Sequence, residues 1–119
     1  MSKIKIKVEI INEEERQILD TTGILSNEIL KYLEENKTLV LWNYEKNILT
    51  RENDEWKMTY LFVPQKKTTG IIKMKDMQRN IKLEIETEKI ERKDHDIKIY
   101  YLIEGKKYLY QIEEIKWVY

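Results

Sequence analysis

The sequence contains no cysteine, and this absence excludes disulfide bonds, thiolate zinc sites and thiol nucleophiles together. Histidine occurs once, at His95, and serine occurs only at Ser2 and Ser26, so the usual partners in zinc or serine chemistry are scarce. His95 lies between two aspartates, but adjacent residues of a turn point apart, and a solvated turn is the simpler interpretation. We therefore expect a protein that is not an enzyme and has no metal or cofactor.

The sequence also lacks an excess of charge of either sign. It has 22 basic and 22 acidic residues, which give a formal net charge of zero. Long-range attraction to nucleic acid or to an anionic membrane is therefore not built into the molecule. Only four of the basic residues are arginine, which is the better side chain for recognising phosphates and bases. We expect neither nucleic acid nor membrane as a partner.

Long apolar runs are absent as well. The first residues, "MSKIKIKVEI", alternate between apolar and charged where a signal peptide would need a continuous apolar stretch. With 119 residues, of which 41% are hydrophobic, the chain has the size and composition of one soluble domain with a core. The sequence thus predicts a cytoplasmic protein with a single domain over residues 1–119.

What the chain does contain is a repeated period-two pattern, typical of half-buried strands. Ile4, Ile6, Val8 and Ile10 share one face of the first segment, and charged residues occupy the other. Three later segments repeat the pattern, with the inward sets Trp56, Met58, Tyr60, Phe62; Ile81, Leu83, Ile85, Thr87; and Ile97, Ile99, Tyr101, Ile103. β-Branched and aromatic residues dominate these sets, so we expect a mostly β protein.

Short polar segments separate the predicted strands. They cover residues 44–47, 52–55, 93–96 and 104–107, and each has the composition of a hairpin turn. Strands joined by such short turns must be antiparallel neighbours, so the chain should form a meander. About nine or ten short strands suit a closed barrel or a two-sheet sandwich, and closure would remove exposed edges.

Two segments are ambiguous. In "SNEILKYLEEN" (26–36), Ile29, Leu30 and Leu33 have helical spacing after a capping residue, whereas a strand would place Leu30 and Tyr32 on one face. In the last segment, Tyr108, Tyr110 and Ile112 share one phase, while Ile115 and Trp117 share the other. A β-bulge near Glu113 and Glu114 would restore a common face.

The segment "KKTTGIIK" (66–73) is either a phosphate-binding loop or part of a β-hairpin. A phosphate-binding loop needs several glycines before a lysine and a helix after it, so that backbone N–H groups converge on the anion. Here Gly70 stands alone and a strand pattern follows. The hairpin interpretation is therefore favoured.

The order and spacing of seven segments carry a resemblance to a known family. These segments are "TTG" (21–23), "LKYLEE" (30–35), "ILTREN" (48–53), "WKMTYLF" (56–62), "KKTTGIIK" (66–73), "LEIETEKI" (83–90) and "IKIYYLIEG" (97–105). With them the chain resembles the YwiB-like family, an uncharacterised bacterial group with a calycin-like (lipocalin-like) β-barrel. The resemblance implies a single antiparallel meander closed into a small barrel of about eight to ten strands. It also favours a strand over a helix for "ILKYLEE" (29–35).

Two charged residues share the phase of inward-facing neighbours. Glu34 is in phase with Leu30 and Tyr32, and Arg51 is in phase with Leu49. An inward charge costs several kcal/mol unless it is paired or reaches water or a ligand, so the two residues form either a structural salt bridge or the polar anchor of a pocket. Both interpretations stay open.

The aromatic residues, which include eight tyrosines and three tryptophans, can fill a core or line a cavity. We expect the barrel to bind a small, partly apolar molecule inside it or at its mouth. The ligand-binding candidates are Glu34, Arg51, Tyr32, Trp56, Tyr60, Thr87 and Tyr101. The alternative is a protein-interaction module or homodimer that uses an exposed strand face or edge, for example residues 108–119.

Overall fold

The computed structural model describes residues 1–116, which form ten antiparallel strands closed into one barrel. The strands are β1 (Ser2–Asn12), β2 (Arg16–Ser26), β3 (Ile29–Leu33), β4 (Leu39–Asn43), β5 (Ile48–Glu52), β6 (Trp56–Leu61), β7 (Lys66–Met74), β8 (Arg79–Lys93), β9 (Asp96–Ile103) and β10 (Lys106–Glu114). Each strand pairs with the next, and β1 also pairs with β10. The predicted all-β meander and its closure are confirmed. Within these residues, no helix is long and apolar enough to cross a membrane.

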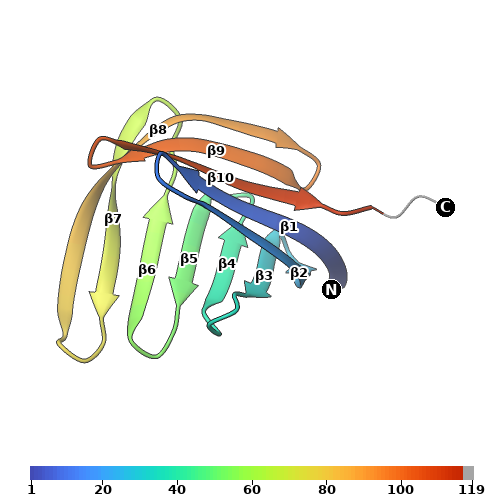
Figure 1. Cartoon of the computed structure of the whole chain (residues 1–119), viewed down its shortest axis with the longest axis horizontal. Coiled ribbons are helices and arrows are strands. Elements are labelled where there is room, and N and C mark those ends of the chain that lie inside the picture. Colours follow the sequence, from blue (N-terminus) through green and yellow to red (C-terminus); the bar gives the residue numbers. More distant parts are fainter. Residues whose placement is uncertain (117–119) are drawn as a thin grey trace.

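The barrel wall has two differently oriented parts (Figure 1). Strands β3 to β7 stand side by side, while β1, β2, β9 and β10 run across them. The long strand β8 pairs with β7 along its first half and with β9 along its second half. Its register shifts between Thr87 and Lys89, and such a bulge bends a strand and increases its twist. This bulge lets one strand belong to both parts of the wall.

The period-two pattern predicted most of the inner face correctly. Ile81, near the start of β8, is the exception, because it is 39% exposed. The most buried members of the four inward sets are Ile6, Val8, Met58, Tyr60, Phe62, Ile85, Thr87, Ile97, Ile99 and Tyr101. The barrel centre is packed with rings: Trp42, Tyr44 and Phe62 are buried, and the rings of Phe62 and Tyr101 lie 4.9 Å apart. Most aromatic side chains therefore fill the core. Trp117, one of the aromatic candidates, lies outside the described residues.

The ambiguous segment 26–36 contains a strand. Asn27 and Glu28 have φ values of 51° and 64°, as the central residues of a two-residue hairpin require, and β3 follows directly. Leu30 and Tyr32 are buried, whereas Leu33 is 56% exposed. The helical spacing was misleading because Leu30 and Leu33, three positions apart, point to opposite faces of a strand.

The predicted bulge near Glu113 and Glu114 is wrong. Strands β10 and β1 pair in continuous register as far as Glu114, which lies opposite Ile6. The strand then ends, and the side chain of Ile115 is 37% exposed. The change of phase in the sequence therefore marks the end of β10. Beyond this point the side chains no longer need to alternate between the core and the solvent.

The barrel end beside the β4–β5 turn is covered by a polar network. The Tyr44 hydroxyl donates to the backbone oxygen of His95 (2.7 Å), and Arg92 donates to the backbone oxygen of Tyr44 (3.0 Å). The His95 ring lies 5.7 Å from the Tyr44 ring, and its Nδ1 is 3.1 Å from Glu114 Oε1. His95 lies on the β8–β9 turn, as predicted, but its side chain is only 36% exposed because Tyr44 and Glu114 pack against it.

The segment "KKTTGIIK" forms most of β7 and pairs with β8, as the hairpin interpretation predicted. Gly70 is not at a bend, however. A Cβ atom at this position would lie 2.7 Å from both Ile85 Cδ1 and Tyr60 Cδ1. The glycine is needed because these buried side chains cross the strand there.

Replacing Gly70 with valine should destabilise the barrel by about 1–3 kcal/mol, since the new side chain overpacks Ile85 and Tyr60. Urea unfolding followed by fluorescence measures the change. Ile71→Thr is the matched control, because Ile71 is 41% exposed on the same strand. Equal midpoints for the Gly70→Val variant and the wild type would contradict the close packing.

Candidate functional site

The site begins where two neighbouring strands separate. β2 pairs with β1 over residues 16–25, but it pairs with β3 only through Ile24, Leu25 and Ser26. If the register continued, Gly23 would lie opposite Tyr32, but the ladder stops at the pair of Ile24 with Lys31. Residues 16–23, most of β2, therefore have no ladder with β3.

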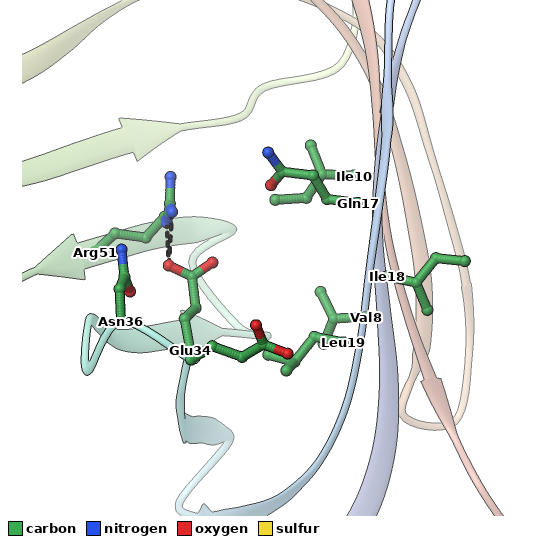
Figure 2. Close-up of a pocket in the computed structure, with 9 residues that line it drawn as sticks. Val8, Ile10, Gln17, Ile18, Leu19, Glu34, Asn36 and Arg51 are labelled. Atoms are coloured by element: carbon green, nitrogen blue, oxygen red, sulfur yellow. Dashed lines mark hydrogen bonds and ion pairs between the residues drawn. The ribbon is translucent and has the colours of Figure 1, made fainter.

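A pocket of about 480 Å³ occupies this gap. Its lining residues come from β1, β2, the β3–β4 turn and β5: Val8, Ile10, Gln17, Ile18, Leu19, Glu34, Glu35, Asn36 and Arg51. In Figure 2 the side chains of Val8, Ile10 and Gln17 face Glu34 and Arg51 across the pocket. The Ile18 side chain points to the outer side of the hairpin. One wall is mainly hydrocarbon and the opposite wall is polar.

Glu34 and Arg51 form the predicted ion pair on the polar wall. Arg51 Nη2 and Nε donate to Glu34 Oε1 at 2.6 Å and 3.2 Å. Strand alternation positions them: Arg51 lies opposite Val40, and Val40 lies opposite Tyr32 on its other side. The side chains are 24% and 17% exposed, so the pair is neither in the dry core nor fully solvated. It lies at the boundary between the core and the pocket.

Tyr32 and Tyr110 lie behind this ion pair. Their hydroxyls share a hydrogen bond across the barrel interior, and both side chains are buried. Burial raises the pKa of both phenols above the usual value, and the nearby carboxylate of Glu34 adds to the rise. Both hydroxyls therefore stay protonated at neutral pH, and the pair braces β3 against β10.

The other candidate residues divide into two groups. The Trp56 ring lies 5.5 Å from the Arg51 guanidinium carbon, so Trp56 belongs to the surroundings of the ion pair. Tyr60, Tyr101 and Thr87 are buried in the core and do not line the pocket. The Thr87 hydroxyl has no hydrogen-bond partner among the described residues. The assignment of these side chains to ligand binding stays a prediction.

Sequence reasoning missed the hydrocarbon wall of the pocket. Val8 and Ile10 share the inner face of β1 with Ile6, and alternation alone does not distinguish side chains that line a pocket from those that fill the core. Gln17 and Leu19 also line the pocket, and their alternation within β2 was a usable signal. The separation of β2 from β3 has no such signal in the sequence. It depends on the number of residue pairs that the short strand β3 forms with the long strand β2.

Residues 108–112, the first part of the C-terminal segment suggested for protein interaction, have no open edge, because both of their edges are paired. Residues 106–112 of β10 pair with β9, and residues 108–114 pair with β1. Tyr110 and Ile112 are buried. A homodimer or a protein partner on another surface stays a prediction.

The fold and the pocket define a class: a ten-stranded, closed antiparallel barrel with an amphipathic pocket in its wall. A solved structure with a similar fold is that of the ywiB protein from Bacillus subtilis, with a TM-score of 0.66 and 23% sequence identity. The match covers 98% of this chain and 91% of that one. No protein-family model matches the chain, and no curated protein matches it. The similarity therefore concerns the fold alone.

Replacing Tyr32 or Tyr110 singly with phenylalanine should cost about 1–3 kcal/mol of unfolding free energy, because the remaining hydroxyl stays buried without its partner. The double replacement removes both polar groups, so it should cost less than the sum of the single effects. Urea unfolding of the three variants measures this coupling. Strictly additive losses would show that the two hydroxyls do not depend on each other.

The barrel should lose stability as pH rises above about 10, where tyrosines of the unfolded chain ionise. Burial raises the pKa of Tyr32, Tyr101 and Tyr110 in the folded state, so the unfolded state releases protons first and is favoured. This stabilising contribution is complete below the unfolded pKa and falls above it. Unfolding free energies measured across the alkaline range test the sign, and a stability that is constant or rises would contradict it.

Proposed function

We propose that this protein binds a small, partly apolar molecule in the pocket between β2 and the β3–β4 turn. The observation that carries the proposal is the amphipathic lining, in which Val8, Ile10 and Leu19 oppose Glu34 and Arg51. The pocket volume of about 480 Å³ is within the range common for small-molecule sites. The ligand's apolar body lies against β1 and β2, and its polar end lies toward the ion pair.

The ion pair can orient that polar end while staying intact. Arg51 uses Nε and Nη2 on Glu34 Oε1, and no bond within residues 1–116 engages Glu34 Oε2. Breaking a half-buried pair to bind a ligand would leave a poorly solvated charge behind. A ligand group that bonds to the outer atoms of the pair avoids this cost. Trp56 holds the guanidinium from another side and limits its movement.

We also propose that the barrel belongs with the calycin-like (lipocalin-like) barrels and, within them, with the bacterial YwiB-like family. The up-and-down order of the strands and the likeness to the Bacillus subtilis ywiB protein support this assignment. A cytoplasmic location is part of the same proposal and is supported by the lack of cysteine. These supports concern the fold and composition, and the ligand is argued from the pocket alone.

Filling the pocket should abolish binding. Leu19→Trp places an indole against the polar wall, whereas Leu33→Trp adds the same group at a position that is 56% exposed. Native mass spectrometry of protein purified from its own host should find a bound mass on the wild type and on the Leu33→Trp variant. The Leu19→Trp variant should lack it. A mass that persists on Leu19→Trp, or a wild type without any bound mass, would contradict the proposal.

A further inference from the structure

β2 has an edge that the barrel does not use. Residues 16–23 pair with β1 on one side, but the ladder with β3 includes none of them. In an antiparallel strand, the backbone N–H and C=O groups of one residue point to one edge, and those of the next residue point to the other edge. Half of the backbone groups of residues 16–23 therefore point toward β3 without a ladder partner, and such an edge can template another strand.

This edge runs along the pocket. Gln17, Ile18 and Leu19 line the pocket from the free part of β2, and Glu34 to Asn36 line it from the opposite side. In Figure 2 the pocket separates the β1–β2 hairpin from Glu34 and Arg51. An occupant of the pocket therefore lies within reach of unpaired backbone groups as well as side chains. Backbone groups of this kind recognise an extended chain better than they recognise a compact molecule.

The side chains around the gap set the chemistry of the occupant. Side chains of an added strand alternate, so one set would enter the pocket and meet Val8, Ile10 and Leu19. The charged lining consists of the carboxylates of Glu34 and Glu35 and one guanidinium, which is already bonded to Glu34. The net charge of this lining is negative, and an acidic occupant would be repelled.

We propose that the occupant of the pocket is a short extended peptide that adds to the free edge of β2 as a new strand. It carries a lysine or arginine side chain directed at Glu34 and Glu35, with an aliphatic side chain against β1 and β2. This proposal rests on the proposed function, because it assumes that the pocket is a binding site, and it names the class of ligand. The backbone supplies affinity and the acidic lining supplies selectivity.

The test uses short capped peptides in which valine and lysine alternate. Two further versions carry N-methyl groups on one or the other alternate set of amides, so each removes the N–H donors from a single edge. Calorimetry with the full chain should show that one methylated version binds at least about tenfold more weakly, whereas the other binds like the parent. A peptide in which glutamate replaces lysine should also bind at least about tenfold more weakly.

Matched variants locate the interaction. Glu35→Gln removes one exposed carboxylate from the pocket lining and should weaken binding of the lysine peptide several-fold. Glu45→Gln removes a carboxylate that is also exposed, from the β4–β5 turn, and should leave the affinity for the lysine peptide unchanged. Both positions are on turns at the surface, so both variants should fold. In nitrogen–proton correlation spectra, the peptide should shift the resonances of residues 16–23 most.

Several results would overturn the proposal. If both methylated peptides bind like the parent, the occupant does not use the edge of β2. If no peptide binds while the wild type still carries a mass that Leu19→Trp loses, the pocket binds another class of molecule and only the present proposal fails. If neither the mass nor the peptide is found, both proposals fail. A dimer that forms with rising protein concentration and shifts residues 16–23 would show that a second copy occupies the edge.

Discussion

The hydrogen-bonded ladder between β1 and β10 is the constraint on which the rest of the structure depends. It joins the first strand of the meander to the last, from Ile6 opposite Glu114 to Asn12 opposite Tyr108. Because side chains alternate along a strand, each strand keeps the same face toward the core. Closure pairs β10 with β9 on one side and with β1 on the other. The inner residues then have to fill a small interior, and rings such as Trp42, Tyr44 and Phe62 do so.

The same ladder explains why the wall opens beside β2. β1 pairs with β10 at one edge and with β2 at the other. Residues 16–25 of β2 therefore lie along β1. β3 is only five residues long, and its ladder with β2 already ends at Lys31, so β3 does not follow β2. The gap exposes the boundary of the core, and Glu34 and Arg51 occupy that boundary as a pair. The hydrogen bond of Tyr32 with Tyr110 supports the wall behind them.

Features of this fold that depend on local sequence could be predicted, whereas features that depend on how distant strands meet could not. Alternation and turn chemistry are local, so the strands, the meander and the inward phase of Glu34 and Arg51 could be predicted. The bulge after Thr87 could not, because it depends on how one strand bends across two parts of the wall. The end of β10 at Glu114 left a change of phase in the sequence, but a bulge would leave the same signal. The pocket depends on strands whose lengths differ, and alternation contains no information about this difference.

The central claim is that residues 16–23 of β2 separate from β3 and leave a pocket beside the Arg51–Glu34 pair. Amide hydrogen exchange of the free protein, resolved residue by residue, tests it most directly. The account predicts that within residues 16–23 alternate amides exchange slowly, through β1, while those pointing toward β3 exchange rapidly. Uniformly slow exchange along β2 would show that its edge is already paired, and the pocket would then not exist as described.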